Sequence, residues 1–113
     1  MNKRLRKKKG KVLDSELWNF DITICNWIIP RLKRFKQINC AYPGRAPMDT
    51  PEAWDEALDK MIQGFEILKD DTIDKYWYEG CDIQEVINKA AEDRKIAHEG
   101  LQLFIDWFES LWI

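Results

Sequence analysis

The sequence has few of the residues on which catalytic and metal sites are usually built. It contains a single histidine, His98, and an odd set of three cysteines, Cys25, Cys40 and Cys81, without paired spacing. Free thiols in a reducing compartment are the simplest interpretation of that set. A zinc site would require these four remote positions to converge, and His98 has no cysteine or serine at a motif spacing. We therefore expect no cofactor, no metal and no enzymatic activity.

Long apolar runs and glycine-rich loops are also missing. No apolar stretch approaches the ~18 residues that cross a bilayer, so we expect no membrane attachment. The segment VLDSELWNFD interrupts any signal-peptide core after the first basic residues. The segment YPGRAP is typical of a turn and not of a phosphate-binding loop. These absences predict a cytoplasmic location.

Charge is distributed unevenly along the chain. Of the 113 residues, 45% are hydrophobic and 34% are charged, which is typical of one globular domain. The net charge is −2, and residues 1–12 carry seven cations and no anion, so the remainder carries −9. We predict a flexible basic arm over residues 1–12 and a single helical domain over residues 13–113. The cations of the arm are Lys3, Arg4, Arg6, Lys7, Lys8, Lys9 and Lys11.

Apolar residues at steps of three and four predict a long first helix, which begins near LDSELW and is capped by Asp14 or Ser15. A second stripe beside the main one indicates a helix central to the bundle. Pro30 predicts a bend, or a break into two helices at Ile29. The stripe that we assign to the core is Leu17, Phe20, Ile24, Trp27, Ile28, Leu32, Phe35 and Ile38. The second stripe is Trp18, Ile22, Cys25 and Ile29.

Two further helices follow a proline-rich loop. Thr50 and Pro51 are typical of a helix start, and the helix is expected to end around KDDT, residues 69–72. Thr72 begins a short turn, and Asp82 with Glu85 predicts the start of a long last helix. Without strand alternation, the fold class is all-α, a small bundle of three main helices, or four if the short turn counts. The core positions expected on the last helix are Ile83, Ile87, Ala90, Ala97, Leu101, Phe104, Phe108 and Leu111.

Arg94 falls on an apolar position of the last helix. It either reaches the rim of the core, pairs with a carboxylate, or binds a ligand. The carboxylates considered for pairing are Asp55, Asp59 and Glu66.

Four carboxylates stand one turn apart in two pairs, Glu56 with Asp59 and Asp82 with Glu85. All-α nucleotide pyrophosphohydrolases of the MazG type bind Mg²⁺ with such pairs, and oxygen ligands suit that cation. However, Asp82 and Glu85 are typical of a helix start, and Glu56 and Asp59 flank an apolar stripe as ordinary surface charges do. A magnesium-dependent hydrolase therefore remains a minor alternative.

Several segments resemble a family of uncharacterised small proteins of phages and prophages. They are WNFDITICNWIIPRLKRFKQ, YPG, TPEAWDEALDKMIQGFEIL and EGLQLFIDWFESLW, which lie within residues 17–112. The resemblance implies a phage origin and expression inside a bacterial cell. It implies no activity and no catalytic residues, and it leaves out the basic arm.

Together these patterns favour an accessory protein that binds a macromolecule, either a host protein such as a defence component or a partner in an assembly. Aromatic residues and arginine are the usual anchors of protein interfaces. The contact residues that we expect are Arg31, Lys33, Arg34, Lys36, Tyr42, Arg45, Tyr76, Trp77 and Tyr78.

Two alternatives stay open beside this prediction. The four cations from Arg31 to Lys36 either form a solvated face or, with the arm, bind nucleic acid, although no nucleic-acid motif is visible. The apolar cluster at the end of the chain either closes the core or forms a homo-oligomer. That cluster is Trp107, Phe108, Leu111, Trp112 and Ile113.

Overall fold

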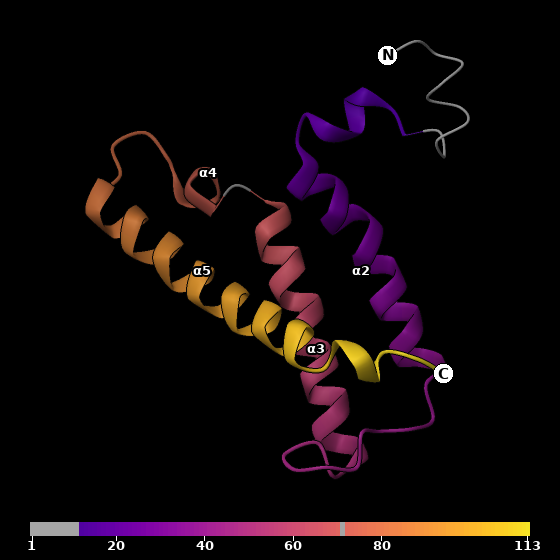
Figure 1. The fold of residues 1–113 in the computed structure, drawn as a ribbon. Helices are drawn as coiled ribbons and strands as arrows, with labels where there is room; N and C mark the ends of the chain where they lie inside the picture. The colour runs from indigo at the N-terminus through magenta and orange to yellow at the C-terminus, as the bar shows by residue number, and fades with distance from the viewer. Residues whose placement is uncertain (1–11, 71) are drawn as a thin grey trace.

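The computed structural model describes residues 12–70 and 72–113, and their regular elements are helical (Figure 1). The cations of the predicted arm fall within residues 1–11 and lie outside the described residues. The fold class is confirmed, with three main helices and a short fourth. In chain order the elements are η1 (Asp14–Leu17), α2 (Phe20–Ile38), α3 (Pro51–Lys69), α4 (Thr72–Tyr76), α5 (Ile83–Asp106) and η2 (Phe108–Ser110).

The two predicted starts of α3 and α5 are confirmed by their caps. The Thr50 hydroxyl accepts a hydrogen bond from the Ala53 amide at 3.1 Å, and Pro51 occupies the first turn. The Asp82 carboxylate accepts one from the Gln84 amide at 3.0 Å. The predicted start of the first helix is wrong, because Asp14–Leu17 form a short 3₁₀ turn and the α-helix begins only at Phe20.

Pro30 does not split the first helix, since α2 continues through it to Ile38. Proline lacks the N–H that would bond to the carbonyl one turn earlier, and Pro30 stands on the exposed side of the helix. The neighbouring Arg31 Nη1 donates a hydrogen bond to the Trp27 carbonyl at 2.9 Å. The carbonyl that loses its helical partner to Pro30 is that of Asn26, an exposed residue, and the helix continues on both sides of it.

α3 is the central helix of the bundle. α2 packs on one side of α3, α5 crosses it on another, and α4 lies against α5 (Figure 1). Among the described residues, no comparable contact joins α2 to α5. Each of these two helices is therefore covered by α3 along one face only.

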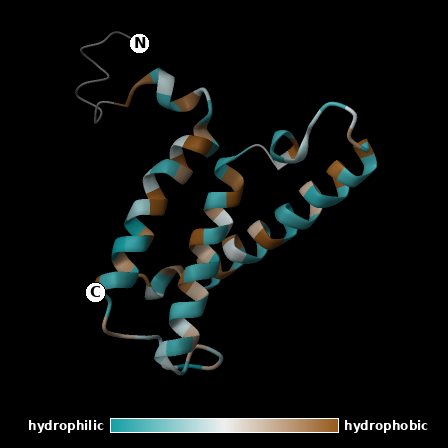
Figure 2. Ribbon diagram, turned by 180° about the vertical axis from the view of Figure 1, so that it is seen from behind, coloured by the Kyte–Doolittle hydropathy of each residue, from teal (hydrophilic) through white to brown (hydrophobic). Residues whose placement is uncertain are grey.

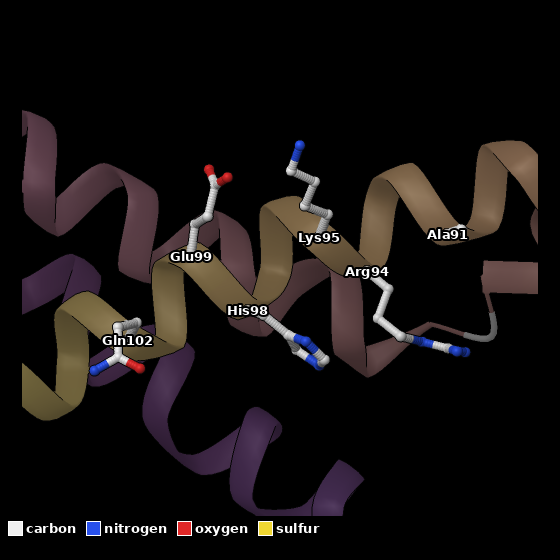
Figure 3. A pocket seen from close by; sticks show the side chains of 6 residues that line it. All are labelled: Ala91, Arg94, Lys95, His98, Glu99 and Gln102. Atoms are coloured by element: carbon white, nitrogen blue, oxygen red, sulfur yellow. The ribbon is translucent and has the colours of Figure 1, made fainter.

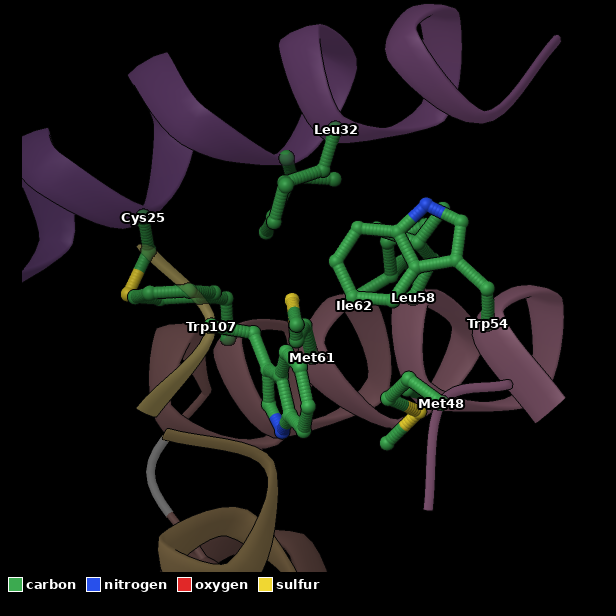
Figure 4. Close-up of a cluster of buried hydrophobic side chains, with 11 residues drawn as sticks. Cys25, Leu32, Met48, Trp54, Leu58, Met61, Ile62 and Trp107 are labelled. Atoms are coloured by element: carbon green, nitrogen blue, oxygen red, sulfur yellow. The ribbon is translucent and has the colours of Figure 1, made fainter. Parts of the chain in front are cut away.

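The core forms where α2, α3, the loop before α3 and the end of α5 meet (Figure 4). Trp54 and Trp107 pack edge to face, with ring centroids 6.3 Å apart. Leu58 and Met61 of α3 are fully buried between the neighbouring elements. The buried cluster consists of Cys25, Ile29, Leu32, Met48, Trp54, Ala57, Leu58, Met61, Ile62, Phe65 and Trp107.

The stripe assigned to the core of α2 is wrong over most of its length. Phe20, Ile24 and Trp27 are 50%, 43% and 57% exposed, whereas Cys25 and Ile29 of the second stripe are buried. Leu17 and Ile38 are exposed as well. Of the predicted stripe, Leu32 is buried, and Ile28 and Phe35 are partly buried against the core as expected. The physical reason is that α2 is apolar over a wide arc while α3 covers only one side of it.

The same correction applies to three positions of the last helical segment. Ile83, Ile87 and Phe108 are each about half exposed or more, although we expected them in the core. The start of α5 extends past α3, and α4 is the helix that packs against this part of the bundle, so the side of α5 turned away from both is uncovered (Figure 1). Val86, which lies on the side of α5 turned toward its neighbours, is buried instead.

Two glycines fix how α5 crosses α3. A Cβ on Gly100 would lie 2.2 Å from the Lys60 carbonyl oxygen, and one on Gly64 would lie 2.8 Å from the Ala97 oxygen. A helical glycine is less favourable than alanine by about 1 kcal/mol. The close approach of the two backbones requires it at both positions. The direction of α5, and hence the place of its two ends, follows from this contact.

Candidate protein-binding surface

Exposed apolar side chains gather where the chain passes from α4 into α5. We call Trp77, Tyr78, Ile83 and Ile87 the aromatic tip. Trp77, Tyr78 and Ile83 are 55%, 63% and 60% exposed. In Figure 1 this region is the end of the molecule farthest from the chain's C-terminus. An aromatic pair with two neighbouring isoleucines, all exposed together, is typical of a protein contact surface.

The tip is anchored at its base by Tyr76. The Tyr76 hydroxyl donates a hydrogen bond to Asp93 Oδ2 at 2.6 Å, and Lys75 Nζ lies 3.5 Å from the same oxygen. Asp93 stands on α5 and its side chain is only 17% exposed, so the contact ties α4 to α5. The hydrogen bond to Asp93, followed by burial, raises the pKa of Tyr76. Of the three predicted contact residues here, Tyr76 is thus structural, and Trp77 and Tyr78 are exposed.

Carboxylates border the tip. Glu79 and Asp82 are exposed in the loop between Tyr78 and the first residue of α5, Ile83. Glu85 is paired on its own helix with Lys89 at 3.1 Å. The hydrogen bond and attraction from Glu85 raise the pKa of Lys89. The rim of the tip is therefore acidic.

The four cations from Arg31 to Lys36 do not form one free face. Lys33 bonds Glu66 at 3.0 Å and Lys36 bonds Asp59 at 2.8 Å, so both lysines join α2 to α3. The hydrogen bond to Asp59 raises the pKa of Lys36. Of the four, Arg31 and Arg34 are left facing solvent without an ion pair in the described part of the chain. The nucleic-acid alternative then depends mainly on the arm.

Tyr42 and Arg45 lie in the loop between α2 and α3, away from the tip. Gly44 has a φ of +82°, which turns this loop back on itself. The Arg45 guanidinium stacks over the Trp107 ring, 4.4 Å from its centroid. Tyr42, Arg45 and Trp112 border a cavity of about 300 Å³ between the loop and the end of the chain. The structure thus brings these two predicted contact residues together with the C-terminal cluster.

Arg94 is exposed and forms no ion pair with any described residue. Its side chain and that of His98 extend to the same side of α5, opposite Lys95 and Glu99 (Figure 3). The hollow between them is lined by α5 alone. No second helix of the described chain closes this hollow, so Arg94 is a surface residue.

The carboxylates of the hydrolase alternative are not brought together. Glu56 faces Lys60 at 3.5 Å, and Asp59, Asp82 and Glu85 have the partners given above. The starts of α3 and α5 lie at opposite ends of the molecule (Figure 1). Over residues 12–70 and 72–113, no three histidine, cysteine, aspartate or glutamate side chains are placed to share a metal ion.

The three cysteines are free thiols in separate places. Cys25 belongs to the core, Cys40 is exposed after α2, and Cys81 is half-buried before α5. Burial, reinforced by the charge of Asp21, raises the pKa of the Cys25 thiol.

The apolar cluster at the chain end was expected either to close the core or to form a homo-oligomer, and its residues differ in burial. Trp107 is buried and Leu111 packs against the core, so they help to close the domain. Phe108, Trp112 and Ile113 are 60%, 72% and 73% exposed. Ile105, in the same segment, is 67% exposed. Ile105 is not part of the terminal cluster expected from the sequence, because it lies between residues that were assigned to the core.

The helices of the described chain include none with the length and apolarity that a bilayer span requires. No protein-family model, curated protein or solved structure matches this chain.

Proposed function

We propose that this protein is an accessory protein that acts by binding another protein through the aromatic tip. The observation that carries the proposal is the pair Trp77 and Tyr78, exposed together on a loop whose base is fastened by Tyr76 and Asp93. A loop held in place loses little conformational entropy on binding. Large aromatic side chains presented in this way are the usual energetic centres of interfaces.

The charge of the tip indicates the chemistry of the partner. Glu79 and Asp82 border the apolar side chains and would be complemented by lysine or arginine on the partner. We therefore propose a partner with an apolar patch ringed by basic residues. The apolar side chains of the tip are suited to contact, which favours blocking or assembly as its mode of action.

The setting that we propose is a phage or prophage protein that binds a protein of its bacterial host, including a component of host defence. This setting is supported by the sequence segments that resemble small phage proteins. Binding without catalysis also fits the dispersed carboxylates and cysteines described above.

The test compares binding by the full chain with binding by the Trp77→Ala/Tyr78→Ala double variant. The chain is used to isolate a partner from a host lysate, and the affinity of the purified partner is then measured by calorimetry. We expect the double variant to lose at least about 30-fold in affinity, as central aromatic contacts do.

Trp18→Ala is the matched control, because Trp18 is 79% exposed but lies just before α2, away from the tip. Its affinity should stay within a few-fold of the parent chain. Equal affinities of parent and double variant, or the absence of any specific partner, would show that the tip is not the binding surface.

A further inference from the structure

One face of α2 is both apolar and basic. We call Phe20, Ile24, Trp27, Arg31 and Arg34 the α2 stripe. Their steps of four, three, four and three residues place them on one side of the helix, turned away from buried Cys25 and Ile29. Phe20, Ile24 and Trp27 are about half exposed, and the two arginines follow them along the helix.

The end of the chain presents an apolar and acidic surface. We call Ile105, Phe108, Glu109, Trp112 and Ile113 the C-terminal patch. Its four apolar side chains are 60–73% exposed. The patch contains one carboxylate, Glu109, and a second, the exposed Asp106, lies beside Ile105 in the same segment. The chain's C-terminus lies beside the last turn of α2 (Figure 1). Trp112 of the patch and Asn39, which follows α2, border the same cavity.

We propose that two copies of this chain form a two-fold symmetric dimer, in which the α2 stripe of each copy packs on the C-terminal patch of the other. If a two-fold axis passes between the α2 stripe and the C-terminal patch of one copy, the stripe of that copy meets the patch of the second copy, and its patch meets the second copy's stripe. Both contacts are then made within two chains, so the assembly closes as a dimer. The basic residues Arg31 and Arg34 then face the acidic residues Asp106 and Glu109. This complementarity favours a second copy over an unrelated occupant, because one sequence supplies both halves.

The exposed area agrees with what a stable dimer buries. Seven apolar side chains of the two surfaces are 43–73% exposed. At about 200 Å² for a whole large side chain, they present roughly 800 Å² per copy. Stable protein interfaces bury about 800 Å² per partner. The most hydrophobic half of α2 (Figure 2) would thus be covered by a second copy of the same chain, and no different protein is needed to cover it.

Trp27 is already held in one place before association. The Arg31 guanidinium lies 4.2 Å from the centroid of the Trp27 ring, and its Nη1 donates to the Trp27 carbonyl. A fixed aromatic ring loses little freedom on binding, which makes Trp27 a suitable central contact. The aromatic tip stands at the other end of α5 and stays uncovered, so the dimer is independent of the function proposed above.

Charge reversals on the full chain test the pairing of the two surfaces. Arg34→Glu places a new carboxylate opposite Glu109 in both contacts, and Glu109→Arg places a new guanidinium opposite Arg34. Light scattering should give twice the 13.5 kDa chain mass for the parent. Each single variant should dissociate at least about tenfold more readily, since like charges are brought together.

Mixing the two variants gives the sharper readout. In a mixed dimer, the carboxylate introduced at position 34 of one chain meets the guanidinium introduced at position 109 of the other. The second contact keeps the parent pair, Arg34 with Glu109, so both contacts become complementary. We expect the mixture to recover the dimer, and the double variant Arg34→Glu/Glu109→Arg to recover it as well.

Lys95→Glu, an equal reversal at an exposed site of α5, is the control and should leave the parent mass unchanged. Circular dichroism of each variant establishes that the fold is retained. A parent chain that stays at 13.5 kDa at every concentration would overturn the proposal. So would folded single variants that dimerise as the parent does, or a mixture that fails to recover the dimer.

Discussion

Asp93 shows how a single half-buried carboxylate decides the roles of its neighbours. Three aromatic residues in a row, Tyr76, Trp77 and Tyr78, look equivalent in the sequence. The structure separates them, because only the Tyr76 hydroxyl reaches Asp93, 17 residues away along the chain. A hydrogen bond over that separation cannot be read from local spacing. The sequence therefore identified the region of the tip but not its division into anchor and contact residues.

The hydrogen bond to Asp93 leads to a prediction about pH. Because it raises the pKa of Tyr76 above the value in the unfolded chain, its stabilisation is fully present below the unfolded pKa. It is lost as the pH rises through the pKa of the folded state. The free energy of unfolding of the parent, relative to that of Tyr76→Phe, should fall as the pH increases beyond about 10.

Urea unfolding of the parent and of Tyr76→Phe measures the difference between their free energies of unfolding. It is carried out near pH 9 and near pH 11, one value on each side of the ordinary tyrosine pKa of roughly 10. Tyr76→Phe keeps the ring and removes only the hydroxyl, so other groups that titrate cancel in the comparison. A difference that stays constant across the range would mean that the hydrogen bond does not form in solution.

At the scale of the helix, α2 shows the limit of hydrophobic periodicity. Two apolar stripes run along it, and both have the period of a helix. The periodicity establishes that the segment is helical, but it does not say which stripe meets α3. That choice depends on the neighbouring helix, and Ile29 is buried while Ile24 is not.

Replacing Ile29 and Ile24 one at a time tests which stripe of α2 is buried. Ile29→Ala removes a buried side chain and should lower the free energy of unfolding by about 3 kcal/mol. Ile24→Ala changes a residue that is 43% exposed and should lower it by less than about 1 kcal/mol.

Both substitutions are made in the Arg34→Glu background, so that association does not contribute to the measured stability. Denaturant unfolding followed by circular dichroism supplies the two values. A larger loss for Ile24→Ala would return the core to the stripe that contains Phe20 and Trp27.

At the scale of the whole molecule, the exposure of the six tryptophans shows which surfaces association would bury. Trp54 and Trp107 are buried in the monomer, whereas Trp18, Trp27, Trp77 and Trp112 are exposed. The proposed dimer would cover Trp27 and Trp112 and would leave Trp18 and Trp77 in solvent. Because the emission of indole shifts to shorter wavelength in apolar surroundings, association has a spectroscopic signature.

We expect the tryptophan emission of the parent to move to shorter wavelength as its concentration rises. The emission of Arg34→Glu should stay at the longer wavelength over the same range. Trp27→Phe should reduce the shift of the parent, since it removes one of the two rings that become covered. Identical spectra of the parent at all concentrations would contradict the dimer independently of the mass measurement.

The amino-acid sequence by itself determined the all-helical class, the starts of α3 and α5 and the loop before α3, because caps and periodicity act within a few residues. Only the tertiary structure decided which stripe of α2 is buried, that Lys33 and Lys36 pair with α3, and that Arg94 is exposed. These outcomes depend on how α2 and α5 rest on α3, and in the case of α5 the crossing is set by backbone contact at Gly64 and Gly100. Local patterns record which side chains are apolar, whereas burial depends on what another part of the chain brings next to them.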